Sequence, residues 1–501
     1  MSTTVYEQVS RPRKSTLLWL APIQAASLFT VWAIVSGGQT LRAWILTALL
    51  WLMTLPLLVS LESTLIAMMS FEPLRGLIRR AQYLIVDYTG DDPIHLLTPL
   101  VTLMAVVMLL RSQRLSMFRA TPLAGSVSVL GLIFVLEMFN PLQGSLLIGL
   151  SGALFMLVPL VWFYFGQSVS EKFIHTALRL MVLAGIVASL YGVYQMMFGY
   201  PAFEQYWIDN TDFYSSIAVG HVRRAVATFS SAEEWGRYTE IGAIVAFGLA
   251  AGANKFSARI GWLICGLASL CAVLLSGQRT AVFGLMLGIA TLVLLGASTL
   301  PRAVMRIGLL LLPVVLIVAF VSPPTDADMW SKGDNETVGT LLSHTQRGTL
   351  KPSEEESLQV RLENWKILVT QVIPYRPLGA GLGVGSLSEM RFSQGSDLPP
   401  IDSFILVLAV ACGIPGVLLF VWILSRATWL SLRTARTATS ARNANINRIV
   451  AALMPALILN SMFGLTFTIY SVAPVAWLLI GWISAETKRI PIEAEREILT
   501  I

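Results

Sequence analysis

Apolar runs about as long as a bilayer is thick follow one another along most of this chain. An apolar segment of roughly 20 residues crosses the hydrocarbon core as a helix, because a helix satisfies its backbone hydrogen bonds within the segment. Only 13% of the 501 residues are charged and 55% are hydrophobic, which is typical of polytopic membrane proteins. We therefore predict an all-α transmembrane bundle of about 12–14 spans, a single integral membrane domain over residues 1–501. The thirteen clearest runs lie near residues 16–36, 41–60, 94–110, 124–140, 144–165, 178–199, 238–253, 260–276, 281–299, 306–321, 403–425, 449–467 and 469–485.

Positive charges indicate how the chain is threaded. Loops rich in Lys and Arg alternate with loops that are poor in them, and cytoplasmic loops carry the excess. The segment Arg426–Arg448 holds five arginines and no acidic residue. We therefore expect this segment and the C-terminus on the cytoplasmic side, and the long polar segment before residue 402 on the external side.

The number of spans conflicts with the charge of the N-terminus. Thirteen spans and a cytoplasmic C-terminus would place the N-terminus outside, yet the first fifteen residues carry two arginines and one lysine, which favours the inside. The conflict points to residues 61–92. Arg75, Arg79 and Arg80 make this interval a poor spanning helix, so we expect an extra irregular or re-entrant crossing there. The topology prediction is firm only from Arg111 onward.

A polar insert of nearly eighty residues, from Ser322 to Pro400, separates two late spans. Connections longer than about 15 residues in a compact domain are usually functional or disordered. We predict that residues 322–402 form a large external loop that roofs an active site. We expect its acidic first part, from Ser322 to Ser357, to form a mobile lid. Its second part is predicted to contain an amphipathic helix through Trp365 and a glycine turn at residues 379–383.

Several arginines are predicted on the external side, against the usual charge bias. A planar guanidinium binds phosphate oxygens as a bidentate fork, so external arginines suit a lipid-linked diphosphate at the membrane surface. Each also has a structural alternative: snorkelling or helix capping for Arg279, pairing with nearby glutamates for Arg223 and Arg224, and a solvated helix face for Arg361. The candidates for substrate binding are Arg223, Arg224, Arg279, Arg361 and Arg376.

Asp402 stands at the mouth of the next span. A carboxylate there can accept a proton from a sugar hydroxyl as a general base, whereas the structural alternative is a helix N-cap formed by Asp402 or Ser403. The external histidines His221 and His344 have no second ligand at zinc spacing. We therefore expect neither a metal site nor another cofactor.

Five elements occur in a recognisable order along the chain: Arg224 with Thr228-Phe229, Ser276 with Arg279, Arg361 with Trp365, residues 377–383 and residues 413–416. Taken together, these elements resemble the superfamily of O-antigen ligases and Wzy-type polysaccharide polymerases, over roughly residues 95–485. Where the ligases carry His-Asn, this chain has Asp402-Ser403, which favours a polymerase.

The resemblance implies a metal-independent, inverting glycosyltransferase in the bacterial inner membrane, with the large loop in the periplasm. Its donor would be an undecaprenyl-diphosphate-linked glycan, and its product exopolysaccharide or O-antigen. In this hypothesis Arg224 and Arg279 hold the diphosphate, Arg223, Arg361 and Arg376 bind substrate, and Asp402 is the catalytic base.

Partners of the same pathway would be a chain-length regulator and a flippase, and no nucleic acid is expected. A ligase, with lipid A-core as acceptor, is the alternative within the superfamily. A lipid-linked sugar transporter or flippase without bond chemistry is the alternative from another class. It would favour ionisable residues near mid-membrane and repeated halves, and the sequence shows no internal repeat.

Overall fold

The computed structural model describes residue 32 and residues 40–87, 92–113, 121–210, 218–219, 222–297, 301, 304–308, 356–384, 398–437 and 440–499. Nearly all of these residues are helical, and the two short strands form one antiparallel pair. The all-α fold class is therefore confirmed. The principal elements are α3 (Thr40–Thr54), η1 (Leu55–Leu58), α4 (Leu61–Ala81), η2 (Gln82–Leu84), η3 (Pro93–Leu96), α5 (Leu97–Gln113), α6 (Ala124–Met138), η5 (Pro141–Gln143), α7 (Leu146–Ser168), α8 (Glu171–Phe198), α9 (Ala202–Asn210), β1 (Ala218–Val219), β2 (Val222–Arg223), α11 (Ala232–Ala251), α12 (Phe256–Leu275), α13 (Arg279–Gly296), α17 (Glu356–Ile367), η7 (Leu368–Val372), η8 (Ile373–Tyr375), α19 (Phe404–Thr437), α20 (Ala441–Phe463), η9 (Thr466–Thr468) and α21 (Ala473–Leu499).

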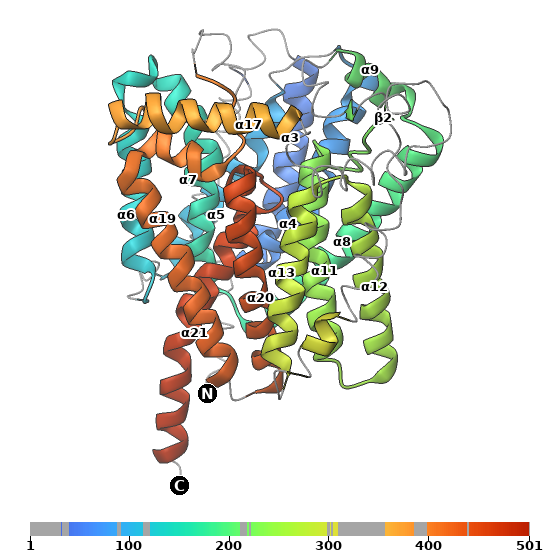
Figure 1. Ribbon diagram of the computed structural model, residues 1–501, viewed down its shortest axis with the longest axis vertical. Coiled ribbons are helices and arrows are strands. Elements are labelled where there is room, and N and C mark those ends of the chain that lie inside the picture. Colours follow the sequence, from blue (N-terminus) through green and yellow to red (C-terminus); the bar gives the residue numbers. More distant parts are fainter. Residues whose placement is uncertain are drawn as a thin grey trace.

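The long helices run side by side along one axis, and α17 lies across one end of the bundle (Figure 1). We call this the loop end; α9 lies at the same end, and α21 extends beyond the opposite end. Eight helices in the described part of the chain are long and apolar enough to cross a membrane. The predicted run 16–36, apart from Trp32, and most of the run 306–321 lie outside the described residues.

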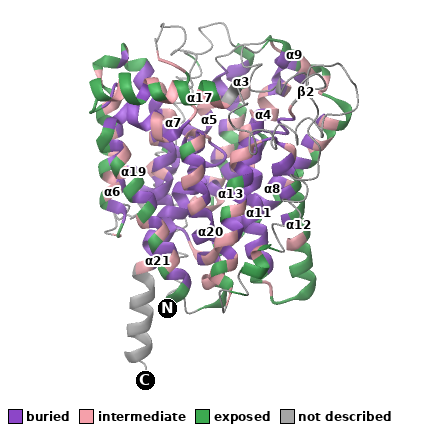
Figure 2. Ribbon diagram, viewed as in Figure 1, coloured by how far each residue is buried: buried purple, intermediate pink, exposed green. Residues whose placement is uncertain are grey.

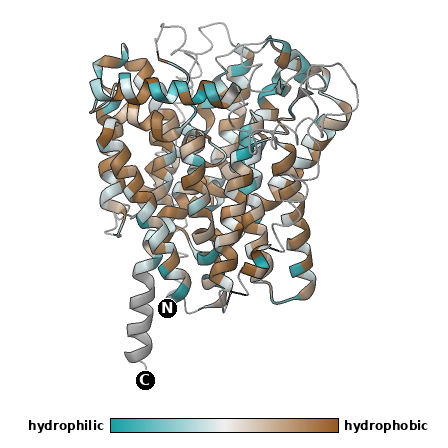
Figure 3. Cartoon of the chain, in the orientation of Figure 1, coloured by the Kyte–Doolittle hydropathy of each residue, from teal (hydrophilic) through white to brown (hydrophobic). Residues whose placement is uncertain are grey.

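Burial and hydropathy follow the same axis. Buried residues concentrate where the helices face one another, while α12 is largely exposed along the outside of the bundle (Figure 2). Hydrophobic residues dominate the middle of the helices, and α17 is marked by hydrophilic residues (Figure 3). This distribution is that of a helical bundle embedded in lipid, with a polar layer at the loop end.

Residues 61–81 form one helix, α4, with Pro73 in its interior, rather than the irregular or re-entrant crossing that we expected. At its start, the Glu62 carboxylate accepts a hydrogen bond from the amide of Ser170, just before α8, at 2.7 Å. At its end, the Arg80 guanidinium lies 2.7 Å from the Glu204 carboxylate, just after α8. Because α4 thus follows α8 from one end to the other, α4 is a full crossing of the bundle.

The polar residues of α4 are tolerated because they pair inside the protein. Arg75 lies 3.1 Å from the Glu72 carboxylate and bonds His95 of η3 at 2.9 Å. All three residues face other helices instead of lipid, where unpaired charges would be costly. The expectation of an irregular or re-entrant crossing was therefore wrong. α4 is nevertheless not among the eight described helices that are long and apolar enough to cross a membrane, which agrees with the expectation of a poor spanning helix.

Helix α19 breaks near the loop end. Gly413 has φ 65°, a left-handed conformation that favours glycine. A Cβ at this position would lie 2.2 Å from the carbonyl oxygen of Pro377. Two residues later, Pro415 has no N–H to continue the helix ladder. The break leaves the carbonyls of the preceding turn without helical partners.

The glycine-rich segment at residues 377–384 supplies those partners. The amides of Ala380 and Gly381 donate to the carbonyls of Val410 and Ala411 at 2.9 and 3.2 Å. The predicted glycine turn at residues 379–383 therefore lies against α19. It joins α17 and its continuation to the start of α19, and so helps to position the candidate site.

Candidate functional site

A tight turn joins α12 and α13, as the short gap between the predicted runs 260–276 and 281–299 requires. α12 ends at Leu275, and α13 begins at Arg279. Gly277 has φ 66°, where a side chain would be strained. The buried hydroxyl of Ser276 donates to the carbonyl of Val273 at 2.7 Å. The turn therefore holds Arg279 at the loop end, on the first residue of a helix.

A cavity of about 200 Å³ lies between the start of α13, the helix α17 and the end of α20. Two guanidinium-bearing residues, Arg279 and Arg361, line it together. Guanidinium groups bind phosphate oxygens, and apolar walls suit a hydrocarbon chain. The cavity therefore has the chemistry to hold an anionic group attached to a lipid. Its remaining lining residues are one hydroxyl-bearing and four apolar residues, Thr280, Phe283, Leu358, Leu459 and Phe463.

Asp402 joins this cavity through α17. Its carboxylate forms an ion pair with Arg361 and accepts a hydrogen bond from the indole of Trp365 at 2.9 Å. Trp365 in turn stacks on Phe463, with ring centroids 5.8 Å apart. The side chains of Asp402 and Arg361 are 37% and 34% exposed, so solvent and substrate reach them.

Ser403, and not Asp402, is the N-cap of α19. The hydroxyl of Ser403 accepts a hydrogen bond from the amide of Leu406 in the first turn of α19, at 3.4 Å. Ser403 therefore occupies the cap position, and the Asp402 side chain contacts α17. Leu368, directly after α17, is fully buried whereas Lys366 is exposed, but Val360 and Leu362 of α17 are exposed too, so the apolar residues of α17 do not share one face.

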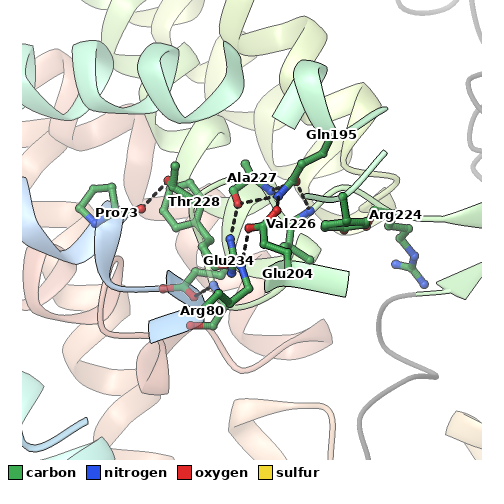
Figure 4. Close-up of polar contacts among 12 residues, drawn as sticks. Pro73, Arg80, Gln195, Glu204, Arg224, Val226, Ala227, Thr228 and Glu234 are labelled. Atoms are coloured by element: carbon green, nitrogen blue, oxygen red, sulfur yellow. Dashed lines mark hydrogen bonds and ion pairs between the residues drawn. The ribbon is translucent and has the colours of Figure 1, made fainter. Parts of the chain in front are cut away.

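The other predicted binding arginines are not among the residues that line the cavity. Arg376 is exposed in the turn after η8. Arg223 lies in β2, and its side chain is outside the described part. Arg224 follows β2, and its side chain points away from Ala227 and its partners (Figure 4). The structure thus brings Arg279, Arg361 and Asp402 together and leaves Arg224 in another part of the loop end.

The segment after Arg224 is docked onto α4. The hydroxyl of Thr228 donates to the carbonyl of Pro73 at 2.5 Å, and the amide of Leu77 donates to the carbonyl of Thr228 at 2.8 Å. Thr228 thereby replaces the helical hydrogen bond between residues 73 and 77. A Cβ at Gly76 would lie 2.3 Å from the backbone of Phe229. The Thr-Phe element therefore has a structural role in attaching this segment.

That attachment is completed by three buried polar residues, Arg80, Glu204 and Gln195. Their association was not predicted from the sequence. Arg80 is 1% exposed; it pairs with Glu204 and donates to the carbonyl of Ala227 at 2.5 Å (Figure 4). Gln195 donates to Glu204 at 2.9 Å and accepts from the amide of Ala227 at 2.8 Å. The available signal was an arginine within an apolar stretch, which requires a buried partner.

Residues 264–421 match the family model described as O-antigen ligase. No curated protein matches the chain. The matched segment contains Arg279, Arg361 and Asp402, so it includes the residues that the cavity brings together, whereas Arg224 precedes it. Over these 158 of its 501 residues the chain is similar to the O-antigen ligase family, in agreement with its resemblance to the superfamily of O-antigen ligases and Wzy-type polymerases.

Proposed function

We propose that the protein is a membrane glycosyltransferase that polymerises oligosaccharide repeats carried on undecaprenyl diphosphate. The observation that supports this most strongly is the cavity shared by Arg279 and Arg361, with apolar walls on one side and Asp402 beside Arg361. A lipid-linked diphosphate has the two complementary parts, a doubly charged head and a hydrocarbon tail.

The proposed reaction is a single displacement. A hydroxyl of the acceptor glycan gives its proton to the Asp402 carboxylate, and the resulting oxygen forms a bond to the anomeric carbon of the donor. The bond from that carbon to the diphosphate breaks, and the lipid diphosphate leaves with the electron pair. Arg279 and Arg361 stabilise the negative charge of the leaving group, and attack from the opposite face inverts the anomeric centre.

The ion pair between Arg361 and Asp402 supports a sequence in which the donor binds before Asp402 becomes available as the base. In the unliganded protein both carboxylate oxygens are engaged, one by Arg361 and the other by Trp365. A diphosphate in the cavity competes for the Arg361 guanidinium and weakens its hold on Asp402. The base is thereby released when the donor is bound.

The proposed orientation places the loop end in the periplasm and the C-terminus in the cytoplasm. α4 raises the predicted number of crossings from thirteen to fourteen. An even number leaves both termini on one side, which agrees with the positive charge near the N-terminus and in the segment Arg426–Arg448. Lipid-linked repeats would therefore meet the site after they have crossed the membrane.

The test is elongation of purified lipid-linked repeats by the purified protein, read as a ladder of products. Arg279→Ala should reduce the rate by about tenfold to a hundredfold, the loss expected for a hydrogen bond to a charged group. Arg259→Ala is the matched control, since Arg259 lies in the first turn of α12, at the opposite end, and contacts the Ala253 carbonyl. If Arg279→Ala and Asp402→Ala both leave the ladder intact, this assignment of the site is wrong.

A ligase is the second candidate, because the matched family model is described as O-antigen ligase. The same assay distinguishes the two enzymes by acceptor. A polymerase extends lipid-linked repeats, whereas a ligase transfers the glycan to lipid A-core and produces no ladder from repeats alone. Movement of lipid-linked sugar across vesicles without any new glycosidic bond would instead support a transporter.

A further inference from the structure

Directly behind the cavity lies a buried arginine that the reaction above does not use. Arg237 of α11 is 2% exposed. Its Nε lies 3.1 Å from the Glu233 carboxylate, and its Nη2 donates to the hydroxyl oxygen of Thr280 at 3.1 Å. Thr280 lines the cavity. The guanidinium is therefore connected to the cavity through one hydroxyl group.

The surroundings of Arg237 are shaped to receive it. A Cβ at Gly464 would lie 2.0 Å from Nη2 and 2.6 Å from the Glu233 carboxylate, so a side chain here would displace the guanidinium or the carboxylate. The carbonyl of Gly464 accepts the amide of Phe404 at 3.0 Å, which links this position to the start of α19 beside Asp402. Arg237 thus lies between the start of α13, the end of α20 and the segment that carries Asp402.

A role confined to stabilising α11 does not explain the arrangement. The pair of Arg237 with Glu233 spans one helical turn, but the Glu233 side chain is 34% exposed whereas Arg237 is buried. Glu240, one turn further along, is already engaged by the amide of Asn460 at 2.8 Å. Within the described residues the Nη1 of Arg237 is buried and has no hydrogen-bond partner. The donor that reaches beyond α11 is Nη2, which bonds Thr280 of α13.

The hydrogen bond from Arg237 to Thr280 leaves the Thr280 hydroxyl able to act as a donor. An oxygen that accepts a hydrogen bond from a guanidinium still has its own proton to donate. Because Thr280 lines the cavity beside Arg279, that proton is available to an oxygen of a bound anion. The positive charge of Arg237 also strengthens the hydroxyl as a donor by polarising it.

We propose that Arg237 is a positioning residue that orients Thr280 as a hydrogen-bond donor to the lipid diphosphate, and that this pair makes the site prefer a diphosphate to a monophosphate. The inference rests on the proposed function and deepens it. Arg279 and Arg361 supply charge to any phosphate, whereas a third donor on the cavity wall is needed only when a second phosphate group must be bound.

The experiment compares the affinity of the purified protein for undecaprenyl diphosphate and undecaprenyl monophosphate. Thr280→Val should weaken binding of the diphosphate by about tenfold or more, the loss of one hydrogen bond to a charged group, and should change binding of the monophosphate much less. Thr280→Ser keeps the hydroxyl and should keep the preference. Arg237→Lys should reduce the preference in the same direction as Thr280→Val.

The matched control is Thr291→Val on the exposed side of α13, where the hydroxyl bonds the Leu287 carbonyl of its own helix. It should leave both affinities unchanged. A folded Thr280→Val protein with the wild-type preference would overturn the inference while elongation by the wild type still supported the function. Absence of both lipid diphosphate binding and elongation in the wild type would reject the proposed function itself. A purely structural role would lower both affinities together.

Discussion

Replacing Asp402 by Asn separates a role in catalysis from a role in stability. The substitution removes the negative charge and keeps the size of the side chain, and an amide oxygen can still accept from the indole of Trp365. The lost interaction is the ion pair with Arg361. Both partners are about one third exposed, and such pairs contribute only about 0.2–1 kcal/mol to folding.

The effect on the reaction is expected to be far larger. A positioned general base contributes about 10²- to 10⁴-fold to a rate, and an amide cannot accept the proton of the acceptor hydroxyl. We therefore expect the initial rate of elongation to fall by about 10²-fold or more, with thermal unfolding of the detergent-solubilised protein nearly unchanged. Lys366→Ala, which removes an exposed charge from α17, should alter neither.

Two results would refute this reasoning. An Asp402→Asn protein that elongates within about threefold of the wild-type rate would exclude Asp402 as the base. A large loss of thermal stability would show that the ion pair with Arg361 holds α17 to the bundle. The rate and the unfolding curve must therefore be measured on the same preparation.

Three further substitutions test the structural interpretation through thermal unfolding. Thr228→Val should destabilise the protein by about 1–3 kcal/mol, because a buried carbonyl of α4 loses its hydroxyl donor, and Thr228→Ser should recover most of the loss. Gly413→Ala should cost about 1–3 kcal/mol or more from its φ of 65° and its approach to a backbone carbonyl, whereas Gly125→Ala, with open space around it, should be tolerated. Glu204→Gln should cost about 3–5 kcal/mol, because it leaves a buried guanidinium without its charge partner, while the exposed Asp209→Asn should have little effect.

The predictions from sequence were most accurate for helices that are exposed to lipid. The runs 260–276 and 281–299 correspond closely to α12 and α13, because a segment exposed to hydrocarbon has to be apolar and helical throughout. The turn that carries Arg279 followed directly from the few polar residues between them. The helix through Trp365 was also predicted from the sequence.

The sequence predicted poorly where polar groups pair inside the bundle. α11 begins six residues before the predicted start at residue 238, because Glu234 and Arg237 are buried and paired instead of marking a loop. The same reason concealed α4 and the partnership of Arg80 with Glu204, which lie 124 positions apart in sequence. A pairing over that distance leaves no local pattern in one sequence.

For the candidate site, the residues could be predicted from the sequence but their arrangement in space could not. Arg279, Arg361 and Asp402 were each identifiable from residue type and position, but their meeting at one cavity depends on how α13, α17 and α20 pack. The Thr-Phe element was part of the resemblance without a predicted role, and only the structure shows that it docks onto α4.

The most direct test of the proposed glycosyl transfer is the ratio of lipid diphosphate released to glycosidic bonds formed by the purified protein. We predict one undecaprenyl diphosphate for each new bond, with inverted configuration at the transferred anomeric carbon and with both products lost in Asp402→Asn. Consumption of lipid-linked repeats without release of the lipid diphosphate, or release without a new glycosidic bond, would contradict the proposal that this site transfers a glycan from its lipid carrier to an acceptor hydroxyl.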